Sequence, residues 1–335
     1  MRLSEIGEFG LIERLRKRLA QPDLEAHGIV GIGDDAAVMP CLGEDLLLLT
    51  TDTLVEDIHF RRNWMTPYQL GWKAMAANVS DIAAMGGRPA HAVVTLAAPP
   101  DLEIEFVDQL FEGLQAVAAE HGARILGGDT VRTHRGVVVG VALTGFVERE
   151  LLLRRFGARR GQALMVTGAL GAAGAGLRLL ERGMNHLSRY AEALQAHRQP
   201  SPRLKAARAL AATRLATACI DLSDGLAGDA RRLAEASGVG LRLRLDRVPV
   251  AEVCRDACAN DLLCDPLEVA LTGGEDYELL FTVPKRAAAP VAERLAREAN
   301  LQATVIGEVV ARAQGVVGIQ ADGTEAPLEG GYQHF

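Results

Sequence analysis

The sequence predicts an α/β protein of two domains, residues 1–150 and 151–335. The chain has 335 residues, which is more than a single hydrophobic core usually organises. Strand-like apolar runs alternate with helical patterns in both halves, as expected for mixed sheets covered by helices. A basic segment at 151–161 lies between the two series, and we expect it to be the crossover between domains.

The first half is expected to alternate helices and strands. Apolar residues recur at helical spacing in 11–20, and Pro67 suits the first turn of a helix that a Gly-Gly pair ends. Within that helix we expect a break at Ser80 or Asp81, with Asp81 capping the next stretch. The expected helices are 11–20, 67–85 and 102–121, and the expected strands are 45–51, 91–98, 124–126 and 137–147.

The second half begins with a strand that enters a glycine-rich turn at 168–176. This turn contains neither G-x-x-x-x-G-K-[ST] nor G-x-G-x-x-G, so a P-loop kinase and a Rossmann dehydrogenase are disfavoured. Its glycines indicate either a helix N-terminus that faces a phosphate or tight packing. The expected strands of this half are 164–167, 241–245, 279–283 and 304–310, and its longer helices are 226–236 and 286–299.

Composition excludes several classes of protein. A net charge of −7 argues against a nucleic-acid partner, and no apolar run is long enough to span a membrane, so we expect a cytoplasmic protein. The chain has five cysteines. Cys254, Cys258 and Cys264 are close in sequence, but no C-x₂-C pair or neighbouring His supports zinc, and free thiols in a reducing compartment are favoured.

Aspartates recur in five segments, each beside Gly, Ser or Thr. The segments are G-I-G-D-D (31–35), T-T-D (50–52), N-V-S-D (78–81), G-G-D-T (127–130) and D-L-S-D-G (221–225). If they converge, each pair of carboxylates about 4 Å apart repels by roughly 4 kcal/mol at an effective dielectric of 20. A hard divalent cation with oxygen ligands, shared with a polyphosphate, would relieve this repulsion. The pattern therefore indicates a Mg²⁺-dependent enzyme that handles ATP.

Each segment also has a simpler explanation. The first could be a turn, the second a strand end, and both Asp81 and Asp224 could be helix caps. The two glycines before Asp129 would let backbone N–H groups face a phosphate. The segment G-G-E-D-Y-E (273–278) is either a ligand-facing loop or a charged turn, and His59 is a weak candidate for a substrate contact. Five acidic segments on one scaffold favour the metal interpretation.

Taken in order, these segments resemble the thiamine-monophosphate kinase family, and the resemblance covers essentially the whole chain. The residues that carry it are G-E-F (7–9), G-I-G-D-D-A-A (31–37), T-T-D-T-L-V-E-D-I-H-F (50–60), N-V-S-D-I-A-A-M-G (78–86), G-G-D-T (127–130), I-D-L-S-D-G-L (220–226), G-G-E-D-Y-E-L (273–279) and G-Y-Q-H-F (331–335). The resemblance implies a two-domain ATP-binding fold shared with aminoimidazole ribonucleotide synthetase. It also implies a homodimer whose N-terminal sheets join into a barrel, and the conversion of thiamine phosphate and ATP to thiamine diphosphate and ADP.

The resemblance also assigns roles to residues. It implies Mg²⁺ ligands at Asp35, Thr50, Thr51, Asp52, Asp81, Asp129, Asp221 and Asp224, with Asp34 supporting them. It implies ATP contacts at Gly128, Asp129, Arg155 and Ser223, and thiamine phosphate contacts at His59, Glu275 and Tyr332. Arg154 sits beside Arg155, and the sequence does not decide between them.

The implied reaction needs no general base, because a phosphate oxygen is already ionised near neutral pH. We expect direct in-line transfer with several Mg²⁺ ions and no phosphoenzyme. The alternatives are a sister synthetase of the selenophosphate or aminoimidazole ribonucleotide type, or a non-catalytic nucleotide-binding protein. The first cysteine, Cys41 between Pro40 and Leu42, does not suit a selenophosphate synthetase, and every motif aspartate is present.

Overall fold

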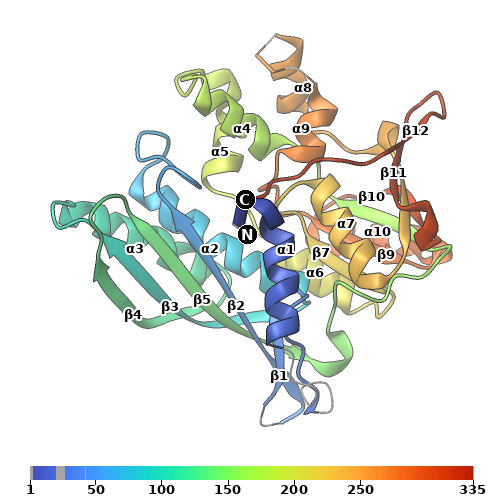
Figure 1. Cartoon of the computed structure of the whole chain (residues 1–335), viewed down its shortest axis with the longest axis horizontal. Coiled ribbons are helices and arrows are strands. Elements are labelled where there is room, and N and C mark those ends of the chain that lie inside the picture. Colours follow the sequence, from blue (N-terminus) through green and yellow to red (C-terminus); the bar gives the residue numbers. More distant parts are fainter. Residues whose placement is uncertain (1–2, 20–26, 42, 261, 264, 335) are drawn as a thin grey trace.

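The computed structural model describes residues 3–19, 27–41, 43–260, 262–263 and 265–334. These described residues form two sheets, one of five strands and one of seven, each covered by helices. Helix α1 (Leu3–Arg18) lies between the two sheets in the view of Figure 1, and the backbone N–H of His334 donates to its Glu8 carboxylate at 3.0 Å. The mixed α/β fold predicted from the sequence is confirmed.

The N-terminal sheet has the order β1-β2-β5-β3-β4. Its strands are β1 (Ala37–Pro40), β2 (Asp45–Val55), β3 (Arg88–Ala98), β4 (Arg124–Arg132) and β5 (Val138–Glu148). Helices α2 (Pro67–Ala84) and α3 (Ile104–Glu120) cover one face, where alternate residues such as Leu48 and Val141 are buried. On the opposite face Leu49 and Val93 remain 40% and 48% exposed. In the described single chain, one face of this sheet is therefore left open.

Helices α2 and α3 cross at two glycines. A Cβ on Gly71 would lie 1.9 Å from the backbone oxygen of Leu110, and a Cβ on Gly113 would lie 1.9 Å from that of Tyr68. Glycine at both positions therefore allows the two helix backbones to come this close.

Replacing Gly71 with Ala should therefore destabilise the protein, because the new methyl group must push α3 away. We expect a loss of roughly 1–3 kcal/mol and a Tm several degrees lower in calorimetry. Gln115→Ala, at an exposed position of α3, is the control and should leave the Tm almost unchanged; equal Tm values for the two variants would contradict the packing argument.

The C-terminal sheet has the order β12-β11-β8-β10-β6-β9-β7 and helices on both faces. Its strands are β6 (Ala163–Thr167), β7 (Ala218–Asp221), β8 (Gly240–Arg244), β9 (Leu279–Val283), β10 (Ala303–Val310), β11 (Val316–Ile319) and β12 (Glu325–Pro327). Its helices are α4 (Ala172–Glu181), α5 (Ala191–Arg198), α6 (Leu204–Ala211), α7 (Leu226–Ser237), α8 (Glu252–Ala259), α9 (Pro266–Thr272) and α10 (Ala288–Ala299). Strands β6 and β9 are buried along their whole length, as expected for central strands.

Three predicted boundaries were wrong in ways that affect the site. Strand β2 does not end at Thr51 but continues to Val55, because it pairs with β5 along its whole length. Helix α2 does not break at Ser80 or Asp81 but runs to Ala84. Strand β4 does not end at residue 126 but continues through the Gly-Gly-Asp segment, with an irregular register. The first helix starts at Leu3 rather than residue 11, and the predicted end at Ala20 lies outside the described residues.

Helix α2 joins the two halves. The Trp72 indole N–H donates to the Pro200 backbone oxygen at 2.8 Å, and the Ser80 hydroxyl donates to the Asp221 carboxylate at 2.5 Å. Through these contacts α2 reaches both sheets, which places it at the centre of any site between them. None of the described helices combines the length and apolarity needed to cross a membrane.

Candidate active site

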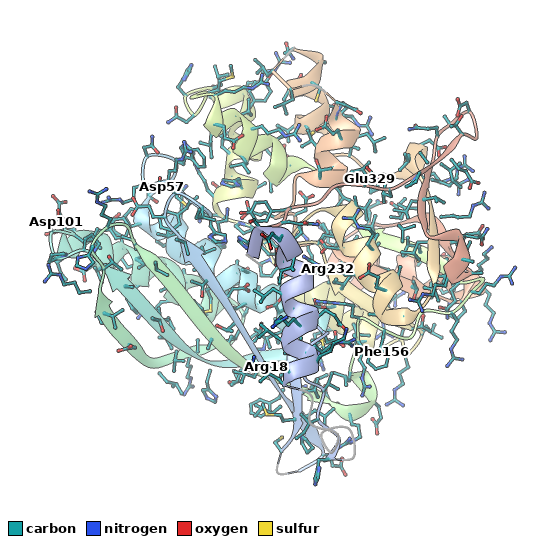
Figure 2. The ribbon with its side chains drawn as sticks, viewed as in Figure 1. Arg18, Asp57, Asp101, Phe156, Arg232 and Glu329 are labelled. Carbon is teal, nitrogen blue, oxygen red and sulfur yellow. The ribbon has the colours of Figure 1, made fainter. Side chains whose placement is uncertain are left out.

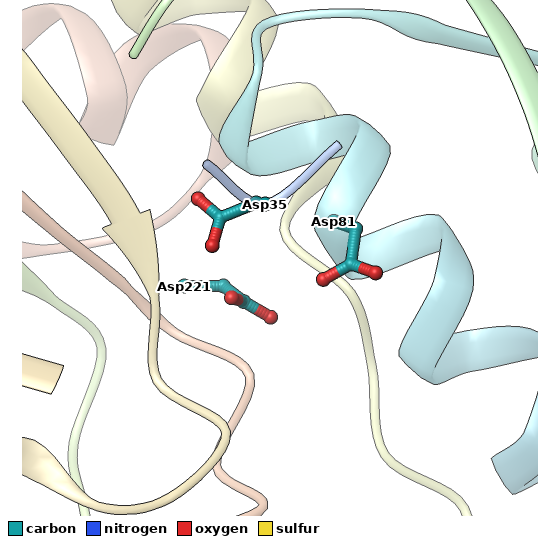
Figure 3. Close-up of side chains that lie close together, drawn as sticks. All are labelled: Asp35, Asp81 and Asp221. Atoms are coloured by element: carbon teal, nitrogen blue, oxygen red, sulfur yellow. The ribbon is translucent and has the colours of Figure 1, made fainter. Parts of the chain in front are cut away.

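Three carboxylates from distant parts of the sequence converge beside α2. Asp35 comes from a loop before β1, Asp81 from the last turn of α2, and Asp221 from the end of β7, and all three point into one space (Figure 3). One oxygen from each lies within 4.8 Å of the others. Among the described residues this is the acidic group placed closely enough to hold a metal ion, and it contains no cysteine. Cys264, part of the disfavoured zinc set, lies outside the described residues.

Asp81 is not a helix cap. It sits within α2, where the Thr50 hydroxyl donates to its carboxylate. Burial, with the nearby charges of Asp52 and Asp221, raises the pKa of Asp81 well above its ordinary value. Burial and the charge of Asp35 likewise raise the pKa of Asp221. The protein alone therefore does not compensate the negative charge that these groups would carry when ionised.

Asp34 and Asp35 face Arg155. The guanidinium of Arg155 contacts the Asp35 carboxylate, and the Arg155 backbone N–H donates to Asp34 at 3.0 Å. Burial and the neighbouring Asp35 raise the pKa of Asp34 to about 7. Arg154 instead lies over the ring of Phe156, so the structure places Arg155, not Arg154, in the acidic cluster.

The donor set fits a hard divalent cation. One buried oxygen of Asp34 and one of Asp35 have no hydrogen-bond partner, and such orphaned groups are costly unless something else satisfies them. Asp52, on β2, interacts directly with the Asp81 carboxyl, and burial raises the pKa of Asp52. Crowded carboxylate oxygens with raised pKa values are what Mg²⁺ would stabilise.

A cavity of about 1350 Å³ borders the cluster through Asp34 and Asp52, whereas Asp35, Asp81 and Asp221 do not themselves line it. Of the predicted site residues, the cavity is lined by Thr51, Asp52, His59, Arg155, Ser223, Asp224, Glu275 and Tyr332. The ring of His334 lies 5.0 Å from those of His59 and Tyr332, so three rings form one wall. Burial, then His334, lowers the pKa of His59, whose Nδ1 accepts the Val55 N–H at 3.0 Å. The same cavity is therefore lined by carboxylates and by the three rings.

Comparison with known proteins gives the family. Residues 33–147 match the AIR synthase related protein N-terminal domain, and residues 159–320 match the corresponding C-terminal domain. The thiamine-monophosphate kinase of Aquifex aeolicus (strain VF5) is 37% identical over 286 residues, spanning 85% of this chain and 88% of that protein. The chain belongs to the thiamine-monophosphate kinase family. The family member of Salmonella typhimurium is 34% identical over 335 residues, 98% of each chain. The solved structure of AaThiL complexed with AMPPCP and TMP has a TM-score of 0.86 and 35% identity, covering 100% of this chain and 99% of that one.

Two residues that the thiamine-monophosphate kinase resemblance assigned to ATP and metal lie elsewhere in this chain. Gly128 and Asp129 are exposed on β4, at the edge of the N-terminal sheet, and do not line the cavity. Asp129 is in register with Thr95, which is exposed, whereas Val94 and Leu96 on either side are buried toward the helices. Asp129 therefore lies on the open face of the sheet. Gly128 has a packing reason to be glycine, since a Cβ there would lie 1.7 Å from the Val94 backbone oxygen.

Two other predicted ligands have partners within the chain. The Thr51 hydroxyl donates to the Val141 backbone oxygen at 3.0 Å. Asp224 is not the N-cap of α7, because Gly225 holds that position and the Asp224 carboxylate pairs with Arg232. Burial raises the pKa of Asp224, although Arg232 opposes this shift. Arg232, labelled in Figure 2, lies on α7 near α1 and also pairs with the buried Asp229 at 2.8 Å.

The glycine-rich turn is explained by packing. The backbone N–H of Gly171, before α4, donates to both Asp276 carboxylate oxygens at 3.0 and 2.9 Å. The protein's own carboxylate thus occupies the helix N-terminus that could have faced a phosphate. Further along, a Cβ on Gly176 would lie 2.1 Å from the Ala193 backbone oxygen, so α4 and α5 pack in close contact.

Sequence reasoning missed several residues of the site. Lys73 and His197 contact Glu275, and Arg232, Asp229 and His334 are described above. Only Lys73 carried a usable signal, because it and Asp81 are the only charged residues of the mostly buried helix α2. The others lie in segments whose position beside the cavity depends on the fold.

Proposed function

We propose that this protein transfers a phosphoryl group from ATP to thiamine monophosphate, giving thiamine diphosphate and ADP. The observation that carries the proposal is one cavity that is bordered by the acidic cluster, through Asp34 and Asp52, and by a wall of rings and Glu275. A polyphosphate with Mg²⁺ suits the acidic cluster, and an aromatic acceptor suits the rings and Glu275. Membership of the thiamine-monophosphate kinase family supports the same pairing of substrates.

We infer that Asp35, Asp52, Asp81 and Asp221 would hold Mg²⁺, with Thr50 orienting Asp81. Bound there, Mg²⁺ would supply neutralisation of the phosphate charges. Arg155 faces the same space and would contact a phosphate of ATP, as would Ser223 at the cavity wall. His59, Glu275 and Tyr332 would contact thiamine monophosphate. No side chain needs to act as a covalent nucleophile, so labelled phosphate should not remain on acid-quenched protein.

We also propose that the protein is a homodimer whose N-terminal sheets close into a barrel. The open sheet face, with exposed Leu49, Val93 and Leu126, supports a second copy as its cover. A second copy would also give Asp129 a role, because this residue lies on the open face, away from the cavity of its own chain. None of the four described cysteines forms a disulfide, which suits a cytoplasmic enzyme.

The test is turnover of the purified protein with Mg²⁺, ATP and thiamine monophosphate, followed by chromatography. We expect thiamine diphosphate and ADP in equal amounts, and neither product without Mg²⁺. ADP without thiamine diphosphate would point to a sister activity with another acceptor. ATP binding without turnover would point to a non-catalytic protein.

A further inference from the structure

Lys73 is a charged residue with no access to water. It lies on α2 with 0% of its side chain exposed, and its Nζ is 2.6 Å from Oε1 of Glu275. The same Nζ is 3.5 Å from Nε2 of His197. Burying an ammonium group is costly unless close partners compensate it. A lysine in this position therefore depends on Glu275 and His197, which belong to the other half of the chain.

His197 completes a closed triangle. It lies on α5, is 1% exposed, and its Nδ1 is 2.9 Å from Oε2 of Glu275. Burial, and next the charge of Lys73, lower the pKa of His197, whereas Glu275 opposes this shift. With its proton on Nδ1, the ring turns that N–H toward Glu275 at contact distance, although the contact does not have the geometry of a hydrogen bond, and Nε2 can then accept from Lys73. The three side chains thus contact one another in pairs: Lys73 with Glu275, Lys73 with His197, and His197 with Glu275.

Glu275 is held by these two partners in an unusual conformation. Its φ of 59° is in the left-handed region, which is strained for a residue with a side chain. Its backbone N–H donates to the Ser223 backbone oxygen at 2.8 Å. The side chain of Glu275 is 23% exposed and forms part of the cavity wall. Burial alone would raise its pKa, but Lys73 and His197 hold the pKa of Glu275 below its ordinary value.

We propose that Lys73 and His197 are positioning residues, which keep Glu275 aimed into the cavity as a hydrogen-bond acceptor for an N–H donor on the heteroaromatic ring of the phosphate acceptor. The inference rests on the proposed function and adds to it. Lys73 is on the same helix as Asp81, two turns earlier. One helix therefore positions both the acidic cluster and the residue that would bind the acceptor.

The experiment compares Michaelis constants for the two substrates. Lys73→Met should raise KM for thiamine monophosphate about tenfold or more and leave KM for ATP within about twofold, because only the acceptor would contact Glu275. Lys205→Met, at an exposed position of α6, is the matched control and should change neither constant. In a Glu275→Gln background, Lys73→Met should raise KM for thiamine monophosphate only slightly further, since the residue that Lys73 positions is already altered. A full additional tenfold effect in that background would overturn the proposal.

His197 offers an independent test that involves no change of formal charge. His197→Asn keeps an N–H donor near the position of Nδ1 and should retain KM for thiamine monophosphate within a few-fold. His197→Leu removes the donor and should raise that KM by about tenfold. This pair serves if Lys73→Met fails to fold. Equal KM values for the two His197 variants, or parallel changes in both substrate constants, would show a purely structural role. A wild-type protein that makes no thiamine diphosphate would instead refute the proposed function.

Discussion

Replacing Asp81 with Asn should lower kcat by on the order of a thousandfold while leaving the fold intact, because the change removes a charged metal ligand from the site. The shape of the side chain is preserved, and the Asn oxygen can still accept from Thr50. Without metal, the variant should be at least as thermally stable as the wild type. Asp52, Asp221 and Asp35 all bear on Asp81 at close range, so removing one charge reduces repulsion. Activity falls while stability does not.

The measurement is kcat with saturating Mg²⁺, together with the Tm in the presence of EDTA. Asp108→Asn is the control, since Asp108 is exposed on α3, and it should leave both quantities unchanged. Mg²⁺ should raise the Tm of the wild type and of this control. It should raise the Tm of Asp81→Asn much less. A variant that retained a tenth of wild-type kcat, or whose Tm rose with Mg²⁺ like the control, would show that Asp81 is not a ligand.

The order of elements could be predicted from the sequence because it depends on local patterns. The strand-like runs at 164–167 and 279–283 became β6 and β9. Element ends were less predictable where tertiary contacts decide them. Strand β2 continues past Thr51 because β5 pairs with it as far as Val55. Helix α2 passes through Ser80 and Asp81 because their side chains bond to other segments rather than to the helix backbone.

The site was predictable to the extent that its chemistry is carried by short motifs. The aspartates of the G-D-D, N-V-S-D and D-L-S-D segments meet as expected. The partners of these and other site residues were not predictable, since Lys73 and Glu275 are about 200 residues apart and no local pattern relates them. Asp129 shows the same limit. Its motif resembles the others, but the register of β4 against β3 decides which face of the sheet it occupies.

The position of Asp129 leads to the second large effect, a rescue between two inactive variants. If a partner chain supplies Asp129, each active site contains the acidic cluster of one chain and Asp129 of the other. Asp81→Asn and Asp129→Asn homodimers should then both be inactive. A hybrid dimer of one chain of each kind contains one site with both wild-type residues and one site with neither. We expect the purified hybrid to show about half of wild-type kcat per dimer.

The matched control reverses the arrangement. A hybrid of a wild-type chain with an Asp81→Asn/Asp129→Asn chain contains the same two substitutions, but each of its shared sites carries one of them. It should be inactive if sites are shared, and about half active if each chain forms its own site. Co-expression with two different affinity tags gives both hybrids, and kcat is measured on each. The opposite result in the two hybrids would place Asp129 in the site of its own chain. Full activity of the Asp129→Asn homodimer would remove Asp129 from the mechanism. Because the hybrids carry the same substitutions, a general loss of stability cannot make one active and the other inactive.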